Sequence, residues 1–156
     1  MNANTNSILS QVTEIQLTYK NKINPSNRPR ITCSEDAYKI LMENWNHDTL
    51  ELLEEFKILL LNRANKVLGI VHISSSGVSG TVADPKLIFA AALKAASSGI
   101  ILSHCHPSGN LKPSEADISL TNRLKNGGAL LEISVLDHLI ITEDGYYSFA
   151  DQGMMN

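Results

Sequence analysis

A strand–helix–strand succession in the middle of the chain most restricts the possible folds. The segment "FKILLLN" is followed by the turn "NRAN" and by "KVLGIVHIS", and both apolar runs are typical of buried strands. The helical pattern "PKLIFAAALKAAS" then leads into the apolar strand "IILSH". A strand, a helix and a second strand in this order form a βαβ crossover. We therefore predict an α/β fold with three layers, in which helices flank a central mixed β-sheet.

The flanking segments should add further elements before and after this unit. Residues 12–20 alternate between apolar and polar side chains and predict a strand. Ser34 is expected to cap a helix, and a second short helix is expected to begin near Thr49. Asp84 should cap the crossover helix, because aspartate before proline is a common helix start.

The C-terminal part predicts one more helix and the last strands. A helix of about a dozen residues should begin at Ser114 and end at Gly127 and Gly128. The runs "LLEISVL", "HLIIT" and "YYSF" then predict strands. An exposed edge strand such as "YYSF" could pair with a second copy of the chain, and the oligomeric state stays open.

Length and charge narrow the class of protein. The 156 residues fit one domain, which we place at residues 11–152 after a flexible tail at residues 1–10. A net charge of −3 lacks the broad basic surface that nucleic-acid-binding proteins usually carry. The sequence shows neither a signal peptide nor an apolar run long enough to span a membrane, so we expect a cytoplasmic protein that does not insert into membranes.

Two histidines at the end of the strand "IILSH" suggest a metal site. Because side chains alternate along a strand, His104 and His106 should project to the same side, while Cys105 projects to the other. Asp117, one turn into the next helix, could supply a carboxylate. Two histidines and one aspartate leave the fourth tetrahedral position open, as in catalytic zinc sites.

Simpler interpretations exist for the same residues. Most histidine pairs with this spacing are ordinary surface or core residues. Ser114 and Asp117 also fit a helix-capping device, in which an acid follows the cap by three residues. His138 is expected to be a hydrogen-bonded strand histidine without a functional role. These alternatives stay open at the level of the residues alone.

The string "HCHPSGNLKPSEAD" resembles the H-x-H-P-x6-S-x-x-D signature of the JAMM (MPN-type) metallopeptidases. The continuation "GALLEISVLDHLIIT" is similar to the bacterial RadC branch, and the likeness is strongest over residues 51–150. The resemblance implies a JAB/MPN fold, which is related to the layered fold of cytidine deaminases. It also implies a zinc-dependent hydrolase that cleaves a peptide or isopeptide bond in a peptide or protein substrate of unknown identity.

The resemblance assigns a role to each residue of the signature. It implies that His104, His106 and Asp117 bind one Zn²⁺ per chain and that Ser114 hydrogen-bonds the zinc-bound water or the oxyanion formed from it. An upstream glutamate acts as the acid/base in the family. Glu54 falls in that register, and its neighbour Glu55 is the alternative.

A second hypothesis is a binding or scaffold module on the same fold, acting in DNA repair or DNA metabolism without catalysis. Only the family name suggests that the protein binds nucleic acid. The helix-hairpin-helix region associated with DNA binding in RadC proteins has no room in the residues before position 51. A nucleobase deaminase is excluded because the chain has no C-x-x-C pair.

Overall fold

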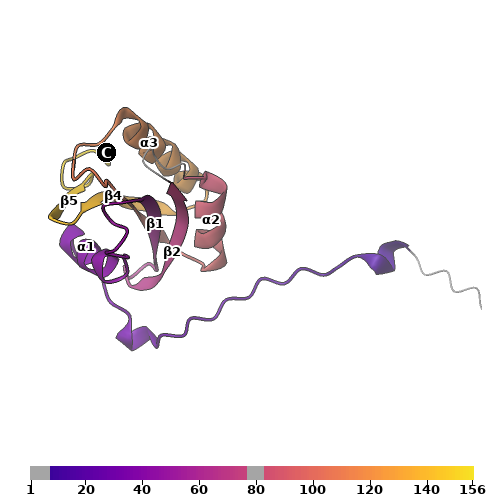
Figure 1. The fold of residues 1–156 in the computed structure, drawn as a ribbon. Helices are drawn as coiled ribbons and strands as arrows, with labels where there is room; N and C mark the ends of the chain where they lie inside the picture. The colour runs from indigo at the N-terminus through magenta and orange to yellow at the C-terminus, as the bar shows by residue number, and fades with distance from the viewer. Residues whose placement is uncertain (1–7, 77–82) are drawn as a thin grey trace, which may run out of the picture.

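A five-stranded mixed sheet forms the centre of the computed structural model, which describes residues 8–76 and 83–156. The strand order is β2-β1-β3-β4-β5; β3 and β4 run parallel, and the other neighbouring pairs are antiparallel (Figure 1). The strands are β1 (Glu54–Leu61), β2 (Val67–Ser76), β3 (Gly99–Cys105), β4 (Ser134–Thr142) and β5 (Gly145–Ser148). The helices are α1 (Ser34–Glu43), α2 (Pro85–Lys94) and α3 (Glu115–Leu130), with short 3-10 turns at Ile8–Gln11 and Pro25–Asn27.

The alternation of side chains along β1 divides the core between the two faces of the sheet. Leu59 packs in one cluster with Leu41 of α1, whereas Ile58 packs in the other with Ile88 of α2 and Leu124 of α3. Full burial of side chains of this size stabilises the fold by about 1.5–3 kcal/mol each. The result is the predicted arrangement of three layers, with α1 on one face and α2 and α3 on the other (Figure 1).

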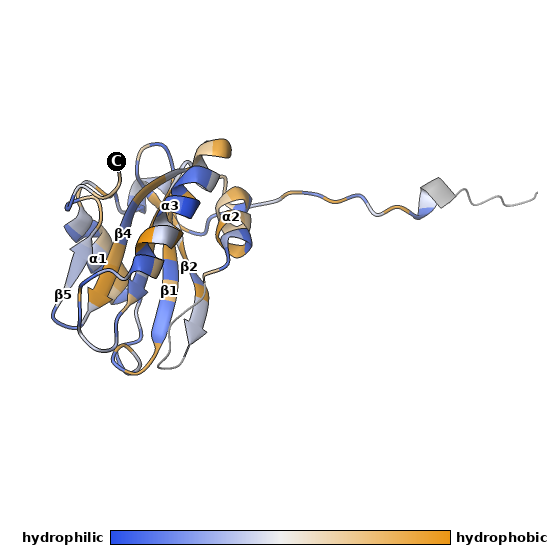
Figure 2. Cartoon of the chain, turned by 90° about the horizontal axis from the view of Figure 1, so that it is seen from above, coloured by the Kyte–Doolittle hydropathy of each residue, from blue (hydrophilic) through white to orange (hydrophobic). Residues whose placement is uncertain are grey.

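The crossover predicted from the middle of the chain is confirmed. β2 and β3 run in the same direction on either side of β1, and α2 connects them. The Asp84 side chain caps α2 by accepting a hydrogen bond from the backbone N–H of Lys86. Figure 2 shows that α2 is mostly hydrophobic in colour, whereas α3 mixes hydrophobic and hydrophilic positions, since one side of α3 stays in water. No described helix has the length and apolar character needed to cross a membrane.

The strand predicted over residues 12–20 is wrong. These residues have no regular secondary structure, and the segment extends away from the sheet (Figure 1). Ile15 and Leu17 are 85% and 95% exposed. An alternating pattern forms a strand only when a neighbouring strand accepts its hydrogen bonds, and none does so here within the described residues. Of the predicted tail, residues 1–7 lie outside the described part of the chain, and a 3-10 turn begins at Ile8.

Two helix predictions near α1 are also wrong. Residues 47–52 form turns instead of a helix at Thr49. α1 begins as expected, but Cys33 holds the cap position instead of Ser34. The Ser34 hydroxyl instead hydrogen-bonds Tyr146 at 3.0 Å and donates to the carboxylate of Asp151, so it links α1 to the C-terminal segment.

The predicted end of α3 is corrected by the structure. The helix continues through Gly127 and Gly128 to Leu130. The chain reverses only at Glu132, whose φ is +56°. The two strands expected at 130–136 and 138–142 are a single strand, β4.

Candidate metal centre

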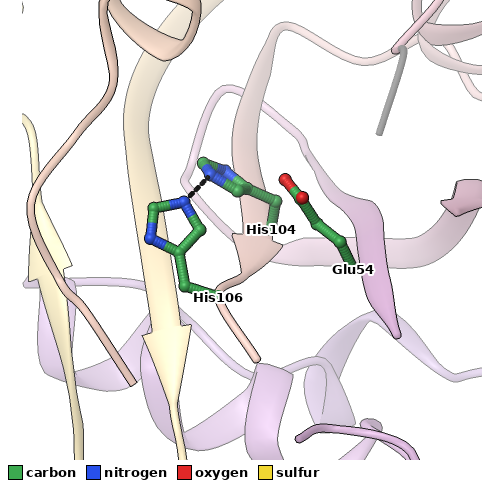
Figure 3. Close-up of side chains that lie close together, drawn as sticks. All are labelled: Glu54, His104 and His106. Atoms are coloured by element: carbon green, nitrogen blue, oxygen red, sulfur yellow. Dashed lines mark hydrogen bonds between the residues drawn. The ribbon is translucent and has the colours of Figure 1, made fainter. Parts of the chain in front are cut away.

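The candidate site lies where β3 ends, on the face of the sheet that α3 covers. His104 is the sixth residue of β3 and lies opposite Phe56 of β1. The backbone N–H of His106 donates to the carbonyl of Ile141 at 3.0 Å, so the pairing with β4 continues one residue past the strand. The alternation therefore holds at both histidines, and their rings converge (Figure 3).

The potential ligand atoms lie close together. The Nε2 atoms of His104 and His106 are 2.9 Å apart. Asp117 places Oδ1 at 3.3 Å from Nε2 of His104 and Oδ2 at 3.6 Å from Nε2 of His106. Tetrahedral zinc with bonds of about 2.0–2.1 Å separates ligand nitrogens by about 3.3 Å. The two nitrogens would have to move apart by a few tenths of an ångström to admit an ion, and with that movement these residues could hold a metal ion.

The hydrogen-bond chemistry of the pair also fits a cation. Nδ1 of His106 lies 2.5 Å from the carbonyl oxygen of Asn110, which only accepts, so Nδ1 carries the hydrogen. In the neutral ring Nε2 is then a bare lone pair. That lone pair faces another imidazole nitrogen and a carboxylate, which are also potential electron donors. Such an arrangement is stable when a cation, either a proton or a metal ion, lies among the donors.

Local electrostatics favour a charged carboxylate here. Burial alone would raise the pKa of Asp117, but its contacts with the rings of His104 and His106 and the hydrogen bond from the Ser114 backbone hold this pKa well below its usual range. The hydrogen bond to Asp117 in turn raises the pKa of His106, against the opposing effect of burial. Both pKa shifts indicate that the carboxylate of Asp117 stays ionised and attracts a cation.

Glu54 and Glu55 occupy different surroundings. A carboxylate oxygen of Glu54 and ring nitrogens of His104 and His106 all lie within 4.8 Å of one another, and Figure 3 shows the Glu54 side chain pointing toward the pair. Glu55 instead lies 3.7 Å from Nδ1 of His72. The structure therefore brings Glu54 to the centre and leaves Glu55 outside it. Glu54 is placed either to accept a proton or to act as a further ligand.

Ser114 forms the capping box that the simpler interpretation predicted. Its hydroxyl accepts from the backbone N–H of Asp117 at 3.1 Å, and Oδ2 of Asp117 accepts from the Ser114 N–H at 2.8 Å. The two interpretations are not exclusive, because the same carboxylate that caps α3 also faces the histidines. The cap fixes the direction in which Asp117 points.

Cys105 behaves as expected for the opposite face. Its side chain is fully buried, and its sulfur lies 3.1 Å from the carbonyl of Leu53. Burial is the main reason that the pKa of this thiol is raised, so it is a poor nucleophile and a poor ligand.

The sequence did not predict two contacts beside the centre, those of His138 with His104 and with Thr121. His138 of β4 is fully buried and lies between His104 and Thr121 of α3. It is a hydrogen-bonded strand histidine, as predicted, but its partner is a candidate metal ligand. Burial is the main cause that lowers the pKa of His138 well below the ordinary value. The local sequence could not reveal the contact, because it depends on the register of β3 against β4.

A cleft of about 550 Å³ opens beside the centre. It is lined by Glu51, Leu52, Glu54, His106, Pro107, Ser108, Asn110, Lys112 and Ser114. The lining mixes two apolar residues, Leu52 and Pro107, with both signs of charge and several polar groups.

Comparison with known proteins identifies the relatives of the chain. Residues 31–154 match the family described as "RadC-like JAB domain". The chain is 43% identical over 128 residues to a UPF0758 protein of Flavobacterium johnsoniae, which covers 80% of this chain and 53% of that protein. It is 48% identical over 103 residues to a UPF0758 protein of Porphyromonas gingivalis, covering 65% of this chain and 45% of the relative. A UPF0758 protein of Alkaliphilus metalliredigens is 41% identical over 129 residues, with coverages of 83% and 54%. The chain thus spans about half the length of these relatives.

Proposed function

The chain belongs to the RadC-like JAB domain family, and from that premise we propose that it is a zinc-dependent hydrolase that cleaves a peptide or isopeptide amide bond. One observation carries the proposal. His104, His106 and Asp117 converge at the end of β3, with Glu54 beside them at the mouth of a cleft.

His104, His106 and Asp117 would hold the ion, and the residues of the chain support that assignment through their own contacts. The cap of α3 orients Asp117, and the carbonyl of Asn110 orients His106. A bound zinc ion would polarise the scissile carbonyl and lower the pKa of a neighbouring water molecule. Zinc suits the mixture of two nitrogen ligands and one oxygen ligand.

Glu54 is the proton carrier in this proposal. Its carboxylate faces the centre and borders the cleft, so it can take a proton from the attacking water and deliver it to the leaving amine. Ser114 has a different role. Its lone pair is used in capping α3, so its hydroxyl hydrogen can be donated to the oxyanion that forms at the carbonyl.

The substrate we propose is a peptide or a protein that lies in the cleft along Leu52 and Pro107. An extended chain there would bring one amide bond past Glu54 and Ser114. Lys112 on the same wall could pair with an acidic side chain of the substrate.

The proposal is tested first by metal content. The wild-type protein should bind about one zinc per chain, and His104→Ala and Asp117→Ala should lose it, as measured by native mass spectrometry. His72→Ala is the matched control, because His72 is an exposed strand histidine outside the centre. Equal zinc content in all four proteins would end the assignment. Zinc-independent DNA binding that weakens steeply with salt would favour the binding-module hypothesis instead.

A further inference from the structure

A chain of three hydrogen bonds runs from α3 to the candidate ligand His104. The Thr121 hydroxyl lies 2.7 Å from the backbone carbonyl oxygen of Asp117 and 2.7 Å from Nδ1 of His138. Nε2 of His138 lies 2.8 Å from Nδ1 of His104. The contacts connect α3, β4 and β3, and none of His104, Thr121 and His138 lines the cleft.

The hydrogens in this chain have only one consistent direction. The carbonyl of Asp117 has no hydrogen, so the single hydroxyl hydrogen of Thr121 is donated to it. The Thr121 oxygen can then only accept from His138, so the hydrogen of His138 is on Nδ1. A neutral imidazole carries one hydrogen, so Nε2 of His138 accepts, and Nδ1 of His104 must donate.

The surroundings bury both rings and hold them in place. His138 has no exposed surface, and no carboxylate of the described residues is among the hydrogen-bond partners of its ring, so a charge on this ring would be costly. His104 is 2% exposed. Phe149 stacks on His138 with ring centroids 4.8 Å apart, and Phe56 lies parallel to His104 at 6.0 Å. The aromatic rings leave little freedom to rotate either imidazole out of the chain of hydrogen bonds.

We propose that Thr121 and His138 are positioning residues, which set the tautomer of His104 so that the lone pair of its Nε2 is presented to the cation. The inference rests on the proposed metal centre and adds residues to it that touch neither metal nor substrate. Thr121 is anchored to the backbone of Asp117, so the same hydroxyl links two of the three candidate ligands. Outer partners of this kind typically contribute 10–100-fold to metal affinity.

The tautomer can be read directly by ¹⁵N NMR of the imidazole rings in the full chain. His138 of the wild-type protein should carry its hydrogen on Nδ1, with and without zinc, although unconstrained neutral histidine prefers Nε2. Thr121→Val removes the hydroxyl at nearly constant volume, and it should move the hydrogen of His138 to Nε2. Zinc affinity, measured by competition with a chelator, should then fall about 10–100-fold. Thr121→Ser keeps the hydroxyl and should keep both properties.

A wild-type His138 with its hydrogen on Nε2 would overturn the inference, whatever the variants do. So would a Thr121→Val protein that binds zinc as tightly as the wild type. The wild-type spectrum does not depend on whether the variant folds. Absence of hydrolysis would contradict the proposed function and leave the tautomer and the zinc affinity unchanged, so the two failures are distinguishable.

Discussion

Glu54 and Glu55 are neighbours in the chain, but their carboxylates lie in different places. Glu54 faces His104 and His106, whereas Glu55 lies beside His72 and Thr49. Alternation at the start of β1 causes the separation, because successive side chains point to opposite faces of the sheet. The pair therefore offers a matched comparison in which the same chemical change is made inside and outside the centre.

Glu54→Gln should lower the rate of amide hydrolysis by about 10²–10⁴-fold, because glutamine cannot carry the proton. Glu55→Gln should stay close to the wild-type rate. Activity would be measured on a linear or branched amide substrate identified by screening. Zinc content separates the two possible roles of Glu54: an acid/base variant keeps its zinc, whereas loss of zinc would show that Glu54 is a ligand.

Ser114 should show two separable contributions. Ser114→Ala removes the cap of α3 and should lower the free energy of unfolding by about 1 kcal/mol in chemical denaturation. Ser114→Gly should cost only a few tenths of this, because glycine is tolerated at the cap position. Both variants lack the hydroxyl, so both should lose about 10²–10³-fold in hydrolysis if that group donates to the oxyanion. If Ser114→Gly kept most of the activity and Ser114→Ala lost it, the loss would come from reduced stability, and the catalytic role would be contradicted.

The metal-free protein should become less stable as the pH rises from about 7. The folded-state pKa of His106 is raised above its ordinary value of 6.5, mainly by Asp117. The folded state therefore holds more protons than the unfolded state in this range, and the stability gained from His106 is lost as the pH rises through its folded pKa. His138 has a lowered pKa, and its opposite contribution is confined to pH values below about 6.5.

Zinc should reverse the sign of this slope. The ion competes with the proton for His106, so zinc affinity and the stability that zinc provides should increase with pH over the same range. Denaturation curves from pH 7 to 8.5, with a chelator and with excess zinc, check both slopes. His106→Gln should flatten the slope of the metal-free protein. A wild-type slope of the same sign with and without zinc would contradict the placement of His106 in the centre.

Much of the fold follows from local patterns in the sequence. β1, β3 and α2 combine apolar runs with clear boundaries, such as the cap at Asp84, and the structure buries them where expected. Residues 12–20 carry an equally clear alternation and yet form no strand. The difference is the availability of a hydrogen-bonding neighbour, which is a property of the whole sheet and cannot be read from the segment.

The candidate site likewise contains residues that the sequence brings together and one residue that it does not. His104, His106 and Asp117 could be grouped from spacing, because two positions on one strand and the start of the next helix are joined by a short loop. His138 could not be grouped with them from spacing, because 34 residues separate it from His104. In the parallel ladder His138 lies opposite Leu102, and only that register brings its ring beside His104.

Gly127 and Gly128 lie inside α3, although a pair of glycines usually marks the end of a helix. The space around each glycine differs, and this difference can be tested. A Cβ at Gly128 would lie 2.3 Å from the carbonyl oxygen of Ile133, so the returning backbone must move. At Gly127 the Cβ would lie 3.0 Å from the ring of Phe89, which is a side chain that can shift.

Alanine gains about 1 kcal/mol over glycine in helix propensity. Overpacking against fixed atoms costs about 1–3 kcal/mol or more. Gly128→Ala should therefore lower the free energy of unfolding, whereas Gly127→Ala should stay within about 1 kcal/mol of the wild type. Equal effects of the two substitutions in chemical denaturation would show that the close approach at Gly128 does not explain why glycine stands inside the helix.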